Sequence, residues 1–450
     1  MKTNSQNITI VGAGLVGSLL SCYMAKRGYT IDIYERRQDM RKANISAGKS
    51  INLAISTRGW YALEKAGLKK QMEPMAIPMF SRMIHQEDGT TDIQAYGKEG
   101  EAIYSISRGE LNKAMMTLAE KEPNVNFHFD AKCTNVDFKN NTVKFKNLNT
   151  NEVFEKKSDL IFGADGTFSK VRYIMQKTDG FSFSQTYLKH GFKELEIPAN
   201  ADGTHKLPKN HLHIWPRKAF MLIALPNLDG SFTMTLFLAH KGETSFENLK
   251  TDKEIMSFFE KQFPTALEHM PDLLEDFHKN PESSLAYVKA DPWTYESTCL
   301  IGDAAHGVVP FYGQGMNAGF EDCRILDEIV ENNKGENWKK IFEEYNESRV
   351  EDGQAIATMA VEHFINMRDD TASDDFLKRK KFEKVLMKNI PEFLPQYSMV
   401  SFSNIKYSVA MNKGNDQIEM LEKLVKEYPN EQDWEKEAVL NKVREFLNNY

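Results

Sequence analysis

A short apolar strand that runs directly into three spaced glycines is the strongest constraint in this sequence. Residues 8–11 precede Gly12, Gly14 and Gly17 in the spacing Gly-x-Gly-x-x-Gly, and the residues that follow predict a helix through Lys26. In this strand–turn–helix context the pattern indicates a dinucleotide site, because the helix N-terminus presents free N–H groups to a pyrophosphate. The first glycine permits a tight turn, the second a close approach of the backbone, and the third close packing of helix and strand.

A second strand, predicted over residues 30–34, ends at Glu35. This is close to the spacing at which an acidic side chain accepts hydrogen bonds from ribose hydroxyls. We therefore take Glu35 and the neighbouring Arg36 as cofactor-binding candidates. The alternatives are a solvated strand end and a glycine-rich turn that holds no ligand.

Two later segments extend the same site. Residues 159–172 predict a strand, a glycine-bracketed Asp165 and a helix start, and residues 299–319 contain Gly-Asp-Ala-Ala-His, with Asp303, followed by a glycine-rich turn. Together the three motifs resemble those of the FAD-dependent aromatic hydroxylases. The resemblance implies noncovalent FAD, with Asp303 on its ribityl chain and the glycine-rich turn beneath its isoalloxazine ring.

The glycine-rich turn suits a flavin because of charge. Apolar residues recur at helical spacing over residues 323–330, which predicts a helix that begins near Gly315. The unpaired N–H groups and the dipole of this helix would face the anionic pyrimidine end of a reduced flavin. Backbone atoms of Met316 and Asn317 are the expected contacts.

Within that superfamily the sequence resembles the kynurenine 3-monooxygenase family over roughly residues 7–410. The segments that carry this resemblance are 48–59, 81–85, 104–108, 211–217 and 393–400. The resemblance implies a discontinuous cofactor site and a substrate that is an aromatic amino acid.

The same resemblance implies roles for individual residues. Arg82, Tyr96 and Tyr397 match positions that hold the amino-acid end of the substrate, and Ala54 and Arg108 match FAD-binding positions. The chemistry fits, because a planar guanidinium can grip a carboxylate with two hydrogen bonds and phenol hydroxyls can complete the grip. Without the resemblance, Arg82 could be an ordinary surface charge.

One late segment departs from the family pattern. His363 stands where the family has a substrate-contacting Asn, and Asn366 stands where it has a Glu. Both side chains can still hydrogen-bond, so we keep both as substrate-binding candidates. The departure puts in doubt the contact to the substrate's amino group, and a preference for a modified kynurenine stays open.

Other candidates are apolar residues and histidines. Four apolar residues are taken as pocket candidates that could equally belong to the core: Ile223, Leu225, Phe237 and Phe311. His306, beside Asp303, could resemble a base, but it fits better as a structural member of the flavin turn. His211 and His213 share one face of a strand without a recognisable third ligand, so we expect no metal.

Composition excludes several classes of protein. The 450 residues carry a net charge of −7, from 57 basic and 64 acidic residues, and no basic block indicates nucleic-acid binding. The four cysteines form no Cys-x-x-Cys pair, which argues against a zinc site or a disulfide framework. No leader precedes the first strand, and the longest apolar run, residues 219–225, is far shorter than the roughly 20 residues of a spanning helix. We expect a cytoplasmic protein without a membrane anchor, and its oligomeric state stays open.

Strand-like material separates the cofactor motifs, which predicts a discontinuous α/β architecture. A Rossmann-like FAD-binding domain is expected from residues 1–75, 100–180 and 290–335. An inserted β-sheet substrate domain is expected from residues 76–99 and 181–289. Residues 336–450 turn helical and charged, and they predict a C-terminal helical region that packs on the body.

The expected activity is hydroxylation of L-kynurenine to 3-hydroxykynurenine with FAD, NADPH and O₂, as in tryptophan degradation. The sequence contains no second Gly-x-Gly-x-x-Gly, so NADPH is expected to visit transiently. In the family a flavin hydroperoxide carries the chemistry, and we expect no catalytic side chain. Two alternatives stay open: a hydroxylase of another aromatic or phenolic acid, and a flavin-binding protein without hydroxylase turnover.

Overall fold

The computed structural model describes residues 6–42, 52–335, 337–368 and 374–448, and for residues 366–377 it describes no side chains. The side chain of Asn366 and residues 48–51 of the family-like segment therefore lie outside the described residues.

A six-stranded sheet carries the first glycine-rich turn. Its central strand β1 (Asn7–Val11) pairs in parallel with β2 (Thr30–Tyr34) on one side and with β12 (Leu160–Gly163) on the other. These strands read as nearly continuous apolar runs because helices cover the sheet. The full order is β18 (Thr294–Tyr295), β19 (Thr298–Leu300), β12, β1, β2 and β8 (Val125–His128).

Helices follow the strands at the points that the sequence predicts. The helix after the first turn is α1 (Leu15–Lys26), and the helix after the last turn is α10 (Gly315–Asn332), so both expectations are confirmed. Further helices that contribute to this part are α4 (Arg108–Glu120), α5 (Lys170–Met175) and α9 (Asp303–His306).

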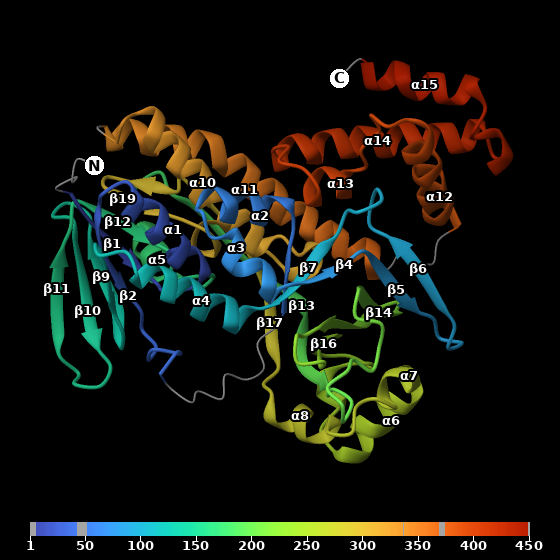
Figure 1. Ribbon diagram of the computed structural model, residues 1–450, viewed down its shortest axis with the longest axis horizontal. Coiled ribbons are helices and arrows are strands. Elements are labelled where there is room, and N and C mark those ends of the chain that lie inside the picture. The colour runs from blue at the N-terminus through green and yellow to red at the C-terminus, as the bar shows by residue number, and fades with distance from the viewer. Residues whose placement is uncertain (1–5, 43–51, 336, 369–373, 449–450) are drawn as a thin grey trace.

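Two small sheets flank this part of the molecule. One is a three-stranded antiparallel sheet at one end (Figure 1), formed by β9 (Ala131–Asp137), β10 (Thr142–Asn147) and β11 (Val153–Lys157). The other has the order β3 (Asn52–Ile55), β7 (Ile103–Ser107) and β4 (Ile77–Met79). Strand β3 leads into α2 (Thr57–Lys65) and α3 (Lys69–Met72).

A seven-stranded sheet forms the second large body. Its order is β17 (Ser283–Asp291), β13 (Ser182–Ile197), β16 (Phe232–Ala239), β15 (Phe220–Pro226), β14 (His211–Arg217), β5 (Ser81–His85) and β6 (Thr91–Ala95). One face is covered by α6 (Asp252–Gln262), α7 (Pro264–Leu267) and α8 (Leu273–Lys279) (Figure 1). The strands fall within the ranges proposed for the substrate domain, except that β17 runs past residue 289, and the domain boundaries stay a proposal.

Alternation along β15 determines which of its side chains point to each face of this sheet. Leu222 and Ala224 pack in the core against α6 to α8, whereas Met221, Ile223 and Leu225 belong to clusters on the opposite face. Successive side chains of a strand point to opposite faces, so the odd-numbered residues of β15 face the cofactor-binding part.

The chain ends in helices, as the sequence predicts. They are α11 (Trp338–Arg368), α12 (Asp374–Asn389), α13 (Gln396–Ser401), α14 (Tyr407–Glu427) and α15 (Glu437–Asn448). Helices α12, α14 and α15 share an apolar core around the buried Trp434, which explains why α15 lies along α14 in Figure 1. Within the described ranges, no helix is long and apolar enough to cross a membrane.

Candidate active site

One cavity of about 300 Å³ lies where the two large sheets and the C-terminal helices meet, within the size range of small-molecule sites. Eight of the substrate-binding candidates line it: Arg82, Tyr96, Ile223, Leu225, Phe237, Phe311, His363 and Tyr397. Six of the cofactor-binding candidates line it as well: Gly14, Ala54, Arg108, Asp303, Gly315 and Met316. The remaining cofactor candidates are not among the residues that line it: Gly12, Gly17, Glu35, Arg36, Asp165 and Asn317.

The three glycines of the first turn have three different surroundings. Gly12 has φ +106°, and a Cβ there would lie 2.5 Å from the carbonyl oxygen of Ala164. A Cβ on Gly17 would lie 2.1 Å from the Gly12 carbonyl oxygen, so α1 packs on the turn through bare backbone. A Cβ on Gly14 would meet nothing within 4 Å. The turn is therefore a cradle with open space over Gly14, which fits a pyrophosphate.

Glu35 ends β2 with its carboxylate folded back on the turn. One oxygen accepts a hydrogen bond from the Ala13 amide at 3.0 Å, and the other accepts from the amide and Nε of Arg37 at 3.0 and 2.9 Å. Burial raises the pKa of Glu35, but these donors more than offset it and hold the pKa below its ordinary value. The neighbouring Arg36 is exposed and does not line the cavity, so the arginine at this carboxylate is Arg37.

The two later acidic candidates differ in orientation. The Asp165 carboxylate accepts hydrogen bonds from the Ser169 hydroxyl and the Lys170 amide, so it binds the start of α5 rather than facing the cavity. Its neighbour Gly166 lines the cavity in its place. Asp303, at the start of α9, does line the cavity, and its carboxylate accepts a hydrogen bond from Thr167 at 3.4 Å.

The turn before α10 is held by the side chain of Asn317. Its amide nitrogen donates to the carbonyls of Ala54 and Gly313 at 2.9 and 2.8 Å, and its oxygen accepts from the Ser56 amide at 2.9 Å. The side chain is fully buried in these contacts, and a contact between the Asn317 backbone and a flavin stays a prediction. Because Met316 lines the cavity one residue earlier, the first N–H groups of α10 lie at the cavity wall.

Arg82 stands on β5 between two tyrosines. Its guanidinium carbon lies 4.9 Å from the ring centroid of Tyr96 and 4.7 Å from that of Tyr397. It pairs with no carboxylate among the residues that the structure describes. The buried Tyr96 hydroxyl has no partner in good hydrogen-bond geometry within the same ranges. The cluster therefore presents to the cavity a cation that no described carboxylate neutralises, next to two phenol hydroxyls, a combination that suits a carboxylate.

His363 and Tyr312 close the same corner of the cavity. The ring of Tyr312 lies 4.7 Å from His363 and 5.6 Å from Tyr397. Burial, and then the charge of Arg82, hold the pKa of His363 well below its usual range, so the imidazole is neutral. A neutral imidazole can accept one hydrogen bond and donate another.

Several wall residues were missed by sequence reasoning, and Met221 and Tyr312 are two of them. Met221 shares the parity of Ile223 and Leu225 on β15, so strand alternation could have found it. Tyr312 directly follows Phe311 in the flavin motif, but its position opposite Tyr397 depends on the packing of the C-terminal helices.

His306 does not face the cavity. Its Nε2 lies 2.5 Å from the Asp322 carboxylate, and its ring stacks on Trp293 with the centroids 4.8 Å apart. It is almost fully buried, which agrees with a structural role in the flavin turn. Among the described residues, no group of three His, Cys, Asp or Glu side chains is placed to hold a metal ion.

Comparisons with known proteins identify the family of this chain. The model of the FAD binding domain family matches residues 5–360. The kynurenine 3-monooxygenase of Flavobacterium johnsoniae is 49% identical, over 98% of this chain and 99% of that protein. The kynurenine 3-monooxygenase of Flavobacterium psychrophilum is 46% identical, over 99% of each chain.

A solved structure shows the same fold. The tetrameric form of 2-methyl-3-hydroxypyridine-5-carboxylic acid oxygenase matches with a TM-score of 0.66 at 17% identity, over 84% of this chain and 96% of that one. The expected fold, an FAD-binding α/β part with an inserted sheet and a helical C-terminal region, is thereby confirmed. The chain belongs to the kynurenine 3-monooxygenase family of FAD-dependent monooxygenases.

Proposed function

We propose that this enzyme hydroxylates L-kynurenine to 3-hydroxykynurenine with FAD, NADPH and O₂. The observation that carries the proposal is Arg82, which meets no carboxylate within the described ranges and is held between Tyr96 and Tyr397 in the cavity that Gly315 and Met316 also line. One end of the cavity thus suits an amino-acid carboxylate and another suits a flavin. Relatives that bear the kynurenine 3-monooxygenase name over nearly the full length support the same assignment.

The amino-acid end of kynurenine binds at the Arg82 cluster. The guanidinium donates two hydrogen bonds to the substrate carboxylate, and the hydroxyls of Tyr96 and Tyr397 add further donors. The neutral His363 accepts a hydrogen bond from the substrate ammonium, the role of the Asn that the family has at this position. Asn366 remains a proposed second contact.

The aromatic end of kynurenine lies against the apolar wall. The residues that form this wall are Met221, Ile223, Leu225, Phe237 and Phe311. They exclude water from the reacting ring, and they orient it because the carboxylate is fixed at the opposite end. The aniline amine activates its own ortho carbon toward an electrophilic oxygen, so no strong protein base is required.

FAD is held along the carboxyl ends of the parallel strands. Gly12, Gly14 and Gly17 form the pyrophosphate turn, and Glu35 binds the ribose while Arg37 orients its carboxylate. Arg36, Asp165 and Asn317 act beside the cofactor rather than through side chains that line the cavity. The flavin contacts proposed at the cavity wall are Ala54, Arg108, Asp303, Gly315 and Met316. When bound, FAD supplies the activation of O₂ and the transfer of oxygen to the ring.

Product analysis tests this function against its alternatives. Purified protein is incubated with FAD, NADPH and either kynurenine or a panel of phenolic and other aromatic acids, and the products are identified by mass. Kynurenine-stimulated NADPH oxidation with one added oxygen atom supports the proposal. Hydroxylation of a phenolic acid alone favours a different aromatic hydroxylase, and flavin binding without any hydroxylated product favours a protein without turnover.

We also propose a cytoplasmic location. All four cysteines are free and buried in the fold, which suits a reducing compartment. Fractionation of cells that express the chain tests this, and recovery mainly in washed membranes would contradict it.

A further inference from the structure

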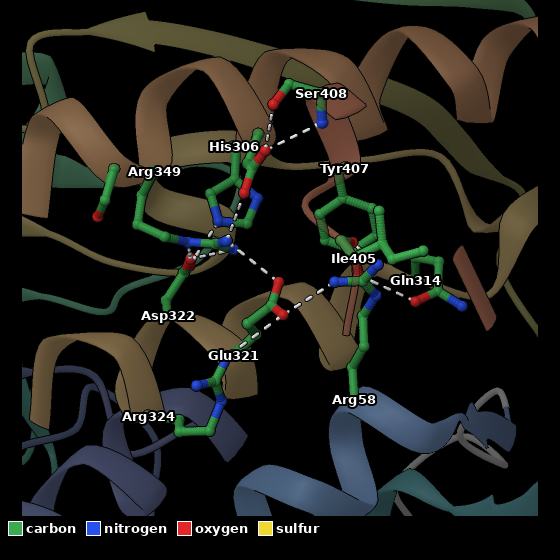
Figure 2. Close-up of polar contacts among 12 residues, drawn as sticks. Arg58, His306, Gln314, Glu321, Asp322, Arg324, Arg349, Ile405, Tyr407 and Ser408 are labelled. Carbon is green, nitrogen blue, oxygen red and sulfur yellow. Dashed lines mark hydrogen bonds and ion pairs between the residues drawn. The ribbon is translucent and has the colours of Figure 1, made fainter. Parts of the chain in front are cut away.

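A buried network of charges (Figure 2) joins α10 to its neighbouring helices, just after the turn of residues 313–316, here called the flavin-facing turn. Its members are Arg58, Arg324, Arg349, Glu321, Asp322 and Asp352. The three arginines balance the three carboxylates in formal charge, which lowers the cost of burying them. The network joins α2, α10 and α11, and Asp352 extends it to α14 by accepting hydrogen bonds from the amide and hydroxyl of Ser408 at 2.9 and 2.8 Å.

Arg58 uses most of its donors outside this network. Its Nη1 donates to Glu321 at 2.9 Å, but its Nε donates to the carbonyl of Val400 at 2.9 Å and its Nη2 donates to those of Met399, at 3.2 Å, and Ile405. The first two carbonyls belong to the last turn of α13, where backbone acceptors lack partners within the helix. Arg58 therefore binds the end of the short helix that carries Tyr397.

Arg58 is also linked to the flavin-facing turn indirectly, through Tyr407. Its guanidinium carbon lies 4.0 Å from the ring centroid of Tyr407, and the Tyr407 hydroxyl donates to the side chain of Gln314 at 3.0 Å. Gln314 directly precedes Gly315, the first residue of α10. Figure 2 shows Arg58, Tyr407 and Gln314 side by side between these segments.

We propose that Arg58 is a positioning residue that fixes Tyr397, and through it the substrate carboxylate, relative to the flavin-facing turn. This inference rests on the proposed function, because it takes Tyr397 as a contact of kynurenine. The planar guanidinium serves four acceptors in different directions, which the single nitrogen of lysine cannot do. A purely structural ion pair would stabilise the fold without setting substrate affinity.

The first test compares Arg58→Lys with a matched control in the FAD-loaded protein. Kynurenine binding is measured by calorimetry, and FAD content is measured alongside. Arg58→Lys is expected to keep its FAD and to weaken kynurenine binding about ten-fold, because charge-assisted hydrogen bonds to α13 are lost. Arg324→Lys disturbs the same Glu321 carboxylate but touches no residue of α13, and its kynurenine affinity is expected to equal that of the parent.

The second test asks whether Arg58 acts through Tyr397. Kynurenine affinity is measured for Arg58→Lys, Tyr397→Phe and the double variant. If Arg58 works by placing Tyr397, the two substitutions remove the same contact. The fold-loss of kynurenine affinity in the double variant is then clearly smaller than the product of the fold-losses in the two single variants. Independent losses that multiply in the double variant would overturn the inference.

A further variant covers the case in which Arg58→Lys does not fold. Tyr407→Leu removes the ring beneath Arg58 and keeps every charge. It is expected to weaken kynurenine binding less than Arg58→Lys does, and this loss is also expected to be less than multiplicative when combined with Tyr397→Phe. Unchanged kynurenine affinity in a folded Arg58→Lys, or in Tyr407→Leu when Arg58→Lys does not fold, overturns the positioning role alone. A parent protein that binds and hydroxylates no kynurenine overturns the proposed function, and the role of Arg58 falls with it.

Discussion

The guanidinium carbon of Arg82 lies 4.7 Å from the ring centroid of Tyr397, although the two residues come from distant parts of the chain. Arg82 stands on β5 of the inserted sheet, and Tyr397 stands on α13 of the C-terminal region. The contact exists only where these two parts meet at the cavity. Under the proposed function, substrate affinity is therefore expected to depend on how the helical region packs on the sheet.

Replacing Arg82 separates substrate binding from flavin binding. Arg82→Ala removes a pair of charge-assisted hydrogen bonds, a loss of about 2–5 kcal/mol where the pair is desolvated. Kynurenine affinity is expected to fall by about 1.4 to 3.6 orders of magnitude, with normal FAD content and a persisting basal rate of NADPH oxidation. Arg82→Lys is expected to recover only part of the affinity. Normal kynurenine hydroxylation by Arg82→Ala would show that the carboxylate binds elsewhere.

His363 tests the departure from the family pattern. His363→Asn restores the family's usual residue, so kynurenine affinity is expected to stay equal or to increase, whereas His363→Leu removes the hydrogen bond and is expected to weaken it about ten-fold. Because the pKa of His363 lies well below its usual range, protonation of this group contributes no loss of affinity between about pH 8 and pH 6. Equal affinity in all three proteins would place the substrate ammonium away from residue 363.

Alanine substitutions at two glycines of the first turn are expected to have different effects, one on stability and the other on FAD binding. A Cβ on Gly17 meets the backbone, and such overpacking costs about 1–3 kcal/mol, so Gly17→Ala is expected to lower the melting temperature even without FAD. A Cβ on Gly14 points into open space, so Gly14→Ala is expected to melt like the parent without FAD but to bind FAD more weakly. Melting curves of the flavin-free proteins and FAD titrations measure both effects. Full FAD affinity in Gly14→Ala would mean that the pyrophosphate lies elsewhere.

A pair of buried histidines predicts acid sensitivity. His85 Nε2 and His213 Nδ1 lie 2.9 Å apart, and burial lowers their pKa values to about 3 and about 4. Both are therefore neutral in the folded protein at pH 5, whereas the unfolded chain binds protons below pH 6.5. The contribution of each neutral histidine to the free energy of unfolding is therefore complete above about pH 6.5. It falls as the pH is lowered, by about 2 kcal/mol per histidine at pH 5.

The variant His85→Gln isolates this contribution. It keeps a hydrogen-bond donor beside His213 but removes one titrating group. The difference in unfolding free energy between pH 7.5 and pH 5 is expected to be smaller than in the parent by about 2 kcal/mol. An identical pH dependence in the two proteins would show that His85 does not contribute to acid lability.

The sequence alone determines the features that follow from local backbone rules. The glycine turn, Glu35 at the end of β2 and the start of α10 at Gly315 were all predictable, because tight turns, strand alternation and helix termini are set by a few neighbouring residues. Alternation along β15 likewise determined that Ile223 and Leu225 share a face.

Only the tertiary structure decided which of several possible partners each side chain contacts, both nearby and far along the chain. It placed Arg37 rather than Arg36 on Glu35, turned Asp165 toward α5, and brought Tyr312 against His363. It also buried Arg58 at the end of α13, a contact without any local signature. The physical reason is that such contacts depend on how whole elements pack, and burial then fixes the charge and the hydrogen-bond partners of each side chain.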